Sequence, residues 1–88
     1  MTPPPTQAPR NGDTTVGNIP WLARMIDKSR LEAAGTIDDF DLEFPCPMDQ
    51  RLLSQLGVSA EQFQKITVSA STDDQILFEL ERIGANLR

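Results

Sequence analysis

The sequence predicts a mainly α-helical protein, built as a small bundle of about four helices with an extended acidic connection after the first helix. Apolar residues recur at helical spacing in four segments, and proline, glycine or capping-box signals mark most of their ends. The chain of 88 residues is long enough for one domain with a small core. We therefore expect a single helical domain over residues 20–88.

Residues 1–19 precede this domain and are rich in Pro, Thr, Gly and Asn. They contain almost no large apolar side chains, so they are not expected to bury enough surface to offset the entropy of ordering. The sequence predicts a disordered, Pro-rich tail without amide protection.

The first helix is expected to begin at Pro20-Trp21 and to end before Gly35, because proline suits a first helical turn and glycine the position after a last one. Its apolar residues fall on one arc at about 100° per residue. They are Trp21, Leu22, Met25, Ile26 and Ala33.

Residues 36–44 break the helical spacing, since Phe40, Leu42 and Phe44 alternate with acidic residues. This alternation predicts an extended, half-buried segment. Whether it pairs as a strand is left open, because no partner strand is evident. A calcium loop would need a glycine that is missing here, so the carboxylates are expected to form a solvated edge.

Three more helices are expected at residues 47–56, at about 60–68, and from Thr72 to about Gly84. Pro47 starts the first of them. The patterns Ser59-Ala-Glu-Gln and Thr72-Asp-Asp-Gln are capping boxes that start the other two. The links between these helices are short, which favours a compact bundle.

Composition excludes several classes of function. The net charge of −5 disfavours nucleic acids and anionic membrane surfaces as partners. Histidine is absent, which excludes Ser-His-Asp catalysis and a Cys/His zinc site within the chain. We expect no catalytic residue, metal ligand or cofactor, and a non-enzyme is favoured. A single cysteine and the lack of a signal peptide or apolar span predict a cytoplasmic protein.

Cys46 lies between two prolines at the start of the second predicted helix. A helix N-terminus favours the thiolate, which would suit a redox thiol, and the Cys-Pro pair resembles a short heme-regulatory motif. The favoured interpretation is structural, with Cys46 packed as a small apolar residue near Phe44 and Met48. A thiol buried in this way is expected to react more slowly with iodoacetamide in the folded than in the unfolded protein.

The polar residues of the first helix form a candidate binding face for an anionic metabolite or an acidic peptide, with a solvated helix face as the alternative. They are Arg24, Asp27, Lys28 and Arg30. Asp49 lies within the apolar arc of the second helix, so it must cap N–H groups or meet a cation. We predict a structural lock in which Arg30 is the partner of Asp49.

Leu31 and Phe78 lie opposite the apolar arcs of their own helices. Two exposed large apolar side chains in a small domain suggest a contact surface. They form a candidate self-association surface.

The segments PWLARMIDKSR (20–30) and FPCPMDQRLL (44–53) resemble the PWLxRMIDKxR and [YF]PCPxDxxLL motifs of a small, mostly bacterial family known only as a domain of unknown function. The resemblance implies a stand-alone soluble protein and supplies no activity or catalytic residue.

These observations favour a non-enzymatic interaction or regulatory module that binds a protein partner or itself. The alternative is a small-molecule or redox-sensing protein that uses Cys46 and the Arg/Lys face of the first helix.

Overall fold

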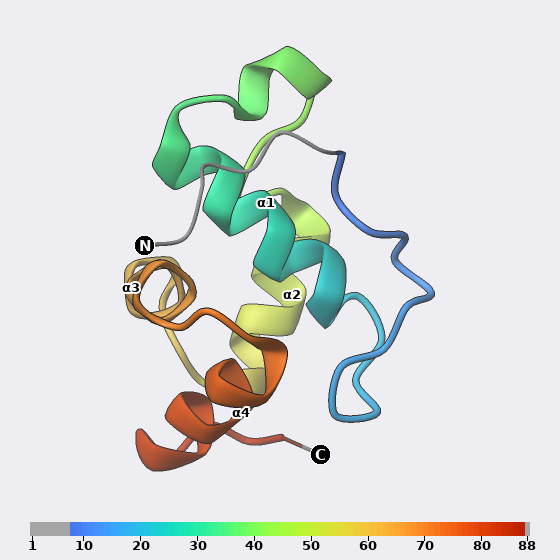
Figure 1. The fold of residues 1–88 in the computed structure, drawn as a ribbon. Helices are drawn as coiled ribbons and strands as arrows, with labels where there is room; N and C mark the ends of the chain where they lie inside the picture. Colours follow the sequence, from blue (N-terminus) through green and yellow to red (C-terminus); the bar gives the residue numbers. More distant parts are fainter. Residues whose placement is uncertain (1–7, 88) are drawn as a thin grey trace.

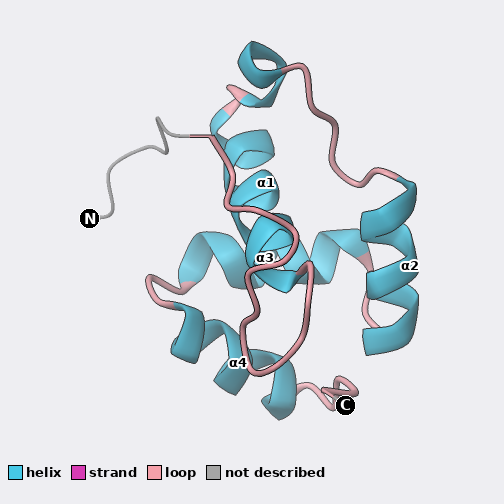
Figure 2. Cartoon of the chain, turned by 90° about the vertical axis from the view of Figure 1, so that its right-hand side faces the viewer, coloured by secondary structure: helices cyan, strands magenta, loops and turns pink. Residues whose placement is uncertain are grey.

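The computed structural model describes residues 8–87, and the predicted all-α fold is confirmed. The elements are α1 (Leu22–Ala34), the 3-10 helix η1 (Ile37–Phe40), α2 (Pro47–Leu56), α3 (Ala60–Ser69) and α4 (Asp73–Arg82), as Figure 1 shows. Helices and loops make up the whole of the described chain, without a strand (Figure 2).

Helix α1 lies at the centre of the bundle and packs against α3, while α3 also contacts α2 and α4 (Figure 1). The apolar arcs of the four helices meet in one core. Its fully buried members include Leu22, Met25, Ile26, Phe63, Ile76 and Leu80. The side of α1 that faces away from α3 is covered by other parts of the chain, so α1 is buried on more than one face.

Local signals set the helix ends. Ser59 and Gln62 form the predicted capping box, with each side chain accepting the other residue's backbone N–H at 3.1 and 2.9 Å. At α4 the Thr72 hydroxyl accepts the Gln75 N–H at 3.2 Å, but the Gln75 side chain accepts from Ser71 instead of Thr72. Glycines in the left-handed region end α1 and α2 as expected.

The structure departs from the sequence prediction at residues 8–19. This segment runs alongside α1 (Figure 1), and Val16 and Ile19 are buried in the common core. Their backbones exchange two N–H to carbonyl hydrogen bonds of 3.0 and 3.2 Å. A few apolar side chains are enough here, because they enter a core that the helices already form. Residues 1–7 of the predicted tail lie outside the described residues.

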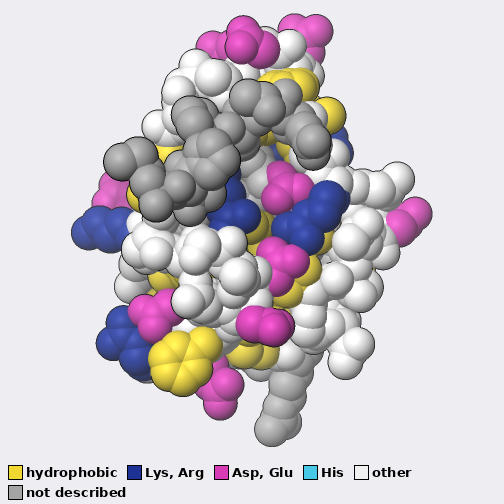
Figure 3. All heavy atoms as spheres, viewed as in Figure 1, with side chains coloured by type: hydrophobic (Ala, Val, Ile, Leu, Met, Phe, Trp, Pro, Cys, Tyr) yellow, Lys and Arg dark blue, Asp and Glu magenta, His cyan; other side chains and the backbone are white. Residues whose placement is uncertain are grey.

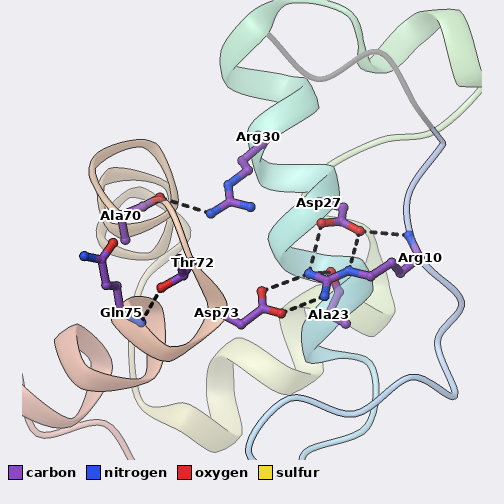
Figure 4. Close-up of polar contacts among 8 residues, drawn as sticks. All are labelled: Arg10, Ala23, Asp27, Arg30, Ala70, Thr72, Asp73 and Gln75. Atoms are coloured by element: carbon purple, nitrogen blue, oxygen red, sulfur yellow. Dashed lines mark hydrogen bonds and ion pairs between the residues drawn. The ribbon is translucent and has the colours of Figure 1, made fainter. Parts of the chain in front are cut away.

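Arg10 attaches the N-terminal segment to two helices. Its guanidinium pairs with Asp27 on α1 at 2.9 Å and with Asp73 at the start of α4 at 2.7 Å (Figure 4). Positive and negative side chains gather at the centre of this face of the molecule (Figure 3). The hydrogen bond from Arg10 holds the pKa of Asp73 below its ordinary range, and the two carboxylates raise the pKa of Arg10.

The Arg10 ion pairs predict a dependence of stability on pH. Because the pKa of Asp73 is lower in the folded than in the unfolded chain, the stabilisation is present above the ordinary carboxyl pKa. It is lost as the pH falls through the folded value. Urea unfolding of the wild type and Arg10→Ala should show a difference in unfolding free energy near pH 7 that shrinks near pH 2. A difference of the same size at both pH values would contradict this role of Arg10.

The prediction of an extended conformation after the first helix is wrong over Ile37–Phe40, which form one turn of 3-10 helix. Because there is no partner strand in the described chain, backbone N–H and carbonyl groups of this segment form hydrogen bonds with each other. The carbonyls of Thr36 and Asp38 accept the N–H groups of Asp39 and Asp41 at 3.1 Å. Ile37 is buried and packs this turn onto the end of α1.

Candidate functional site

A buried polar cluster joins the start of α1 to the start of α2. Asp49 is fully buried in the first turn of α2, and one of its carboxylate oxygens accepts from Trp21 Nε1 at 2.8 Å. Its other oxygen accepts from Lys28 Nζ at 2.7 Å and from the Cys46 backbone N–H at 3.0 Å. The carboxylate therefore links two helices and caps one of them, which is the arrangement of a structural lock.

The partner of Asp49 is Lys28, so the expectation of Arg30 was wrong. Arg30 instead donates to the carbonyl oxygens of Thr67 and Ala70 at the end of α3, at 3.1 and 3.0 Å, and Figure 4 shows its guanidinium directed at Ala70. The last carbonyls of a helix lack intrahelical partners and attract a cation. Lys28 and Arg30 are two residues apart on α1 and therefore face different neighbours.

Cys46 is the N-cap residue of α2 and is only partly buried. Its sulfur lies 3.1 Å from Lys28 Nζ, and the side chain of Lys28 is only 3% exposed. The sequence predicts a thiol buried in apolar surroundings, and the structure instead shows a partly buried thiol whose sulfur contacts a buried ammonium group.

The four polar residues predicted as one binding face of α1 do not act together. Asp27 pairs with Arg10, Lys28 with Asp49, and Arg30 with the end of α3. Arg24 donates to the Arg10 carbonyl at 3.2 Å, and its guanidinium lies 5.6 Å from the centre of the Trp21 ring. All four thus contact another part of the fold, and Arg24 does so through a single hydrogen bond to a backbone carbonyl.

An open groove of about 690 Å³ lies beside Trp21. Residues 11–13 of the N-terminal segment form one wall, and Pro20, Trp21 and Arg24 form the second. Side chains of α2 complete it, namely Met48, Arg51, Leu52 and Gln55. Sequence reasoning missed this groove, because it depends on the docking of a segment that was expected to be disordered.

Trp21 has an unusual backbone conformation at the edge of this groove. Its φ of 74° lies in the left-handed region, which is uncommon for a bulky residue. The conformation is held by a hydrogen bond from its N–H to the Gly12 carbonyl at 2.9 Å and by the indole bond to Asp49. Strained residues that the surroundings hold in place are frequent at functional sites.

Gly12 allows the N-terminal segment to cross the Trp21 ring. A Cβ at position 12 would lie 2.6 Å from the ring, which is too close for two carbon atoms. Gly12→Ala should therefore displace the segment from Trp21, cost about 1–3 kcal/mol of stability and shift the emission of the chain's single tryptophan. Asp13→Ala, at the exposed next position, is the control. Unchanged emission and stability in Gly12→Ala would show that the close contact is not made.

The self-association surface predicted from Leu31 and Phe78 is not formed as expected. Leu31 is fully buried, because the side of α1 opposite the core arc is also covered. Phe78 is 64% exposed on α4, as the sequence predicted for that residue. The two side chains therefore do not share a surface.

Two further features were sought in the described residues, a helix that could span a membrane and a cluster of side chains that could bind a metal ion. Within residues 8–87, no helix is long and apolar enough to cross a membrane. The same part of the chain has no group of three or more His, Cys, Asp or Glu side chains placed to hold a metal ion.

A search of curated proteins finds no similar protein. A family model described as a domain of unknown function (DUF5069) matches residues 6–86. The match includes the N-terminal segment that packs beside α1, so this segment is within the family's domain. The chain belongs to the DUF5069 family.

Proposed function

We propose that the protein is a non-enzymatic interaction module that holds a protein partner in the groove beside Trp21. The observation that carries this proposal is an exposed apolar surface next to two guanidinium groups, those of Arg24 and Arg51. Met48 is 45% exposed in this groove, although it belongs to the apolar arc of α2. An exposed apolar surface with cationic groups at its margin is typical of a contact site.

The residue types of the groove support an interaction role. Trp, Arg and Met are enriched at protein interfaces, and Trp and Arg contribute a large share of binding energy. Trp21 is also fixed before binding, by its backbone contact with Gly12 and its indole bond to Asp49. A preformed aromatic side chain loses little conformational entropy when a partner binds.

Two variants of α2 test the proposal. Gln55→Trp places a bulky side chain in the groove, whereas Gln50→Trp makes the same change on an exposed part of α2 outside it. Proteins that co-purify with the chain from its native cells are identified by mass spectrometry. A partner retained by the wild type and Gln50→Trp but lost from Gln55→Trp is the expected result. Partners that bind all three proteins equally would place the interaction elsewhere.

The contact between Cys46 and Lys28 favours a second candidate function, that of a redox-sensing thiol. The Cys46 sulfur lies at the N-terminus of α2, 3.1 Å from the Lys28 ammonium, which also binds the Asp49 carboxylate. The reaction would use hydrogen peroxide as oxidant. The thiolate sulfur attacks one peroxide oxygen, the S–O bond forms as the O–O bond breaks, and the leaving hydroxide takes up a proton to give water.

Alkylation and oxidation rates distinguish this function from a purely structural Cys46. A sensing thiol reacts with iodoacetamide faster in the folded than in the unfolded protein, and Lys28→Met removes the difference. Peroxide then gives a sulfenic acid that dimedone traps, seen by mass spectrometry. Slower reaction in the folded protein is the expectation from the sequence, and it would leave Cys46 only its role at the N-cap of α2.

A further inference from the structure

We infer that the groove beside Trp21 takes a short acidic segment of a partner protein, with an apolar side chain against Trp21 and Met48 and carboxylates at Arg24 and Arg51. This inference rests on the proposed function and adds the chemistry of the partner. Three observations support it: the positions of the Lys and Arg side chains in the described chain, the groups that these side chains already bind, and the shape of the groove.

Most cations of the described chain are already used inside the fold. Arg10, Lys28 and Arg82 pair with carboxylates, and Arg30 binds carbonyl groups at the end of α3. Among residues 8–87, the remaining cations are Arg24, Arg51 and Lys65, for which the structure shows no ion pair.

Two of these three cations line the same groove. Arg51 is exposed, while Arg24 is fixed over the Trp21 ring and uses one N–H on the Arg10 carbonyl. A guanidinium has five N–H donors, so Arg24 keeps donors for another acceptor. Asp13 is the one carboxylate in the groove lining. The groove is thus locally positive in a protein whose net charge is −5.

The overall negative charge narrows the class of partner. A polyanion such as a nucleic acid would be repelled by the rest of the surface. A short segment with a few carboxylates is affected mainly by charges within about 8 Å at physiological salt. In the groove lining, two arginines stand against the one carboxylate of Asp13. The groove is open to solvent and does not enclose its contents, which suits a peptide chain better than a metabolite that must be enclosed.

The apolar lining of the groove specifies the rest of the segment. Trp21 and Met48 offer a half-buried aromatic ring and an exposed thioether side chain in the same lining as the two guanidinium groups. An acidic segment without an apolar residue would leave this surface in water. The matching segment therefore combines one or two large apolar residues with flanking Asp or Glu.

Synthetic hexapeptides test the inference, with the emission of Trp21 as the readout. The probe is Asp-Glu-Leu-Phe-Asp-Glu, blocked at both ends. It is compared with the charge-reversed Lys-Lys-Leu-Phe-Lys-Lys and with Asp-Glu-Ser-Ser-Asp-Glu, which has no apolar residue. Because none of these peptides contains tryptophan, the change in emission comes from the protein alone. We expect the first peptide to bind, with affinity that falls as salt is added, and the other two to bind far more weakly.

Arg51→Ala and Lys65→Ala form a matched pair of variants. Both residues are exposed cations without an ion pair in the described chain, but only Arg51 lines the groove. Loss of a charge-assisted contact should weaken binding of the acidic peptide about tenfold or more in Arg51→Ala. Lys65→Ala should bind as the wild type does. Equal unfolding midpoints of the two variants show that folding is not the cause.

Three outcomes would overturn the inference: equal binding of the charge-reversed peptide, equal effects of the two variants, or tighter binding of a single-stranded oligonucleotide. If no hexapeptide binds but a cellular partner is still lost from Gln55→Trp, the interaction module stands and the acidic segment is wrong. If Gln55→Trp loses no partner and no hexapeptide binds, the proposed function fails as well.

Discussion

Asp49→Ala is expected to destabilise the protein by about 3–5 kcal/mol, because it leaves the buried Lys28 ammonium without its carboxylate. The same change removes the acceptor of the Trp21 indole N–H and of the Cys46 backbone N–H. Unsatisfied buried donors add to the cost. Urea unfolding monitored by circular dichroism measures the effect.

Three further variants separate the contributions to this loss. Lys28→Met should cost less than Asp49→Ala, since the carboxylate keeps two N–H donors. The double variant with both Asp49→Ala and Lys28→Met should lose less stability than the two single losses added together, because neither buried charge is left without its partner. Glu43→Ala, at an exposed carboxylate, should change stability by less than about 0.5 kcal/mol. An Asp49→Ala effect as small as that of Glu43→Ala would show that the lock does not stabilise the fold.

Removal of residues 8–19 is expected to lower the free energy of unfolding by about 3–6 kcal/mol. This figure counts only the lost burial of Val16 and Ile19. The ion pairs of Arg10 are lost as well. For a domain of this size the melting temperature should fall by more than about 10 °C. A chain that begins at Pro20 is compared with one that begins at Ala8, so the difference reports on this segment only.

Hydrogen exchange provides a second measurement on the chain that begins at Ala8. The backbone N–H groups of Ile19 and Trp21 donate to Val16 and Gly12, so both should be protected from exchange. Equal melting temperatures of the two chains, together with rapid exchange at Ile19 and Trp21, would show that the segment does not pack.

The helices could be predicted from the sequence because their signals are local. The capping box at Ser59 and Gln62 and the glycines at 35 and 57 act within one helical turn, and the structure places them as predicted. The position of Asp49 in an apolar arc likewise indicates a buried, paired carboxylate, and the contact with Lys28 has that form. Such inferences need only the spacing of residues along one helix.

The features that sequence reasoning missed depend on contacts between distant segments. Arg10 is stabilised by Asp73, which lies 63 positions further along the chain, and no local pattern marks such a pair. The choice between Lys28 and Arg30 as partner of Asp49 depends on how α1 is rotated relative to α2 and α3. Leu31 is buried because α1 is covered on more than one side.

The groove beside Trp21 also depends on contacts between segments that are distant in the sequence. Trp21 could be recognised as an apolar residue at the start of a helix, but its place at the edge of a groove requires the docked loop around Gly12. Arg51 gave no signal of its own, since a single arginine on an exposed helix face is ordinary. Its proximity to Arg24 is visible only in the folded protein.

NMR chemical shifts of the backbone amides and of the indole N–H give the most direct test that the groove is the binding site. They are recorded while the acidic hexapeptide is added. The single indole signal comes from Trp21, whose N–H is bound to Asp49. We expect the largest shift changes at this indole and at the backbone amides of Gly12, Arg51 and Gln55, with little change on α3 and α4. Changes centred on α3 or α4, or none at a peptide concentration that alters Trp21 emission, would contradict the account.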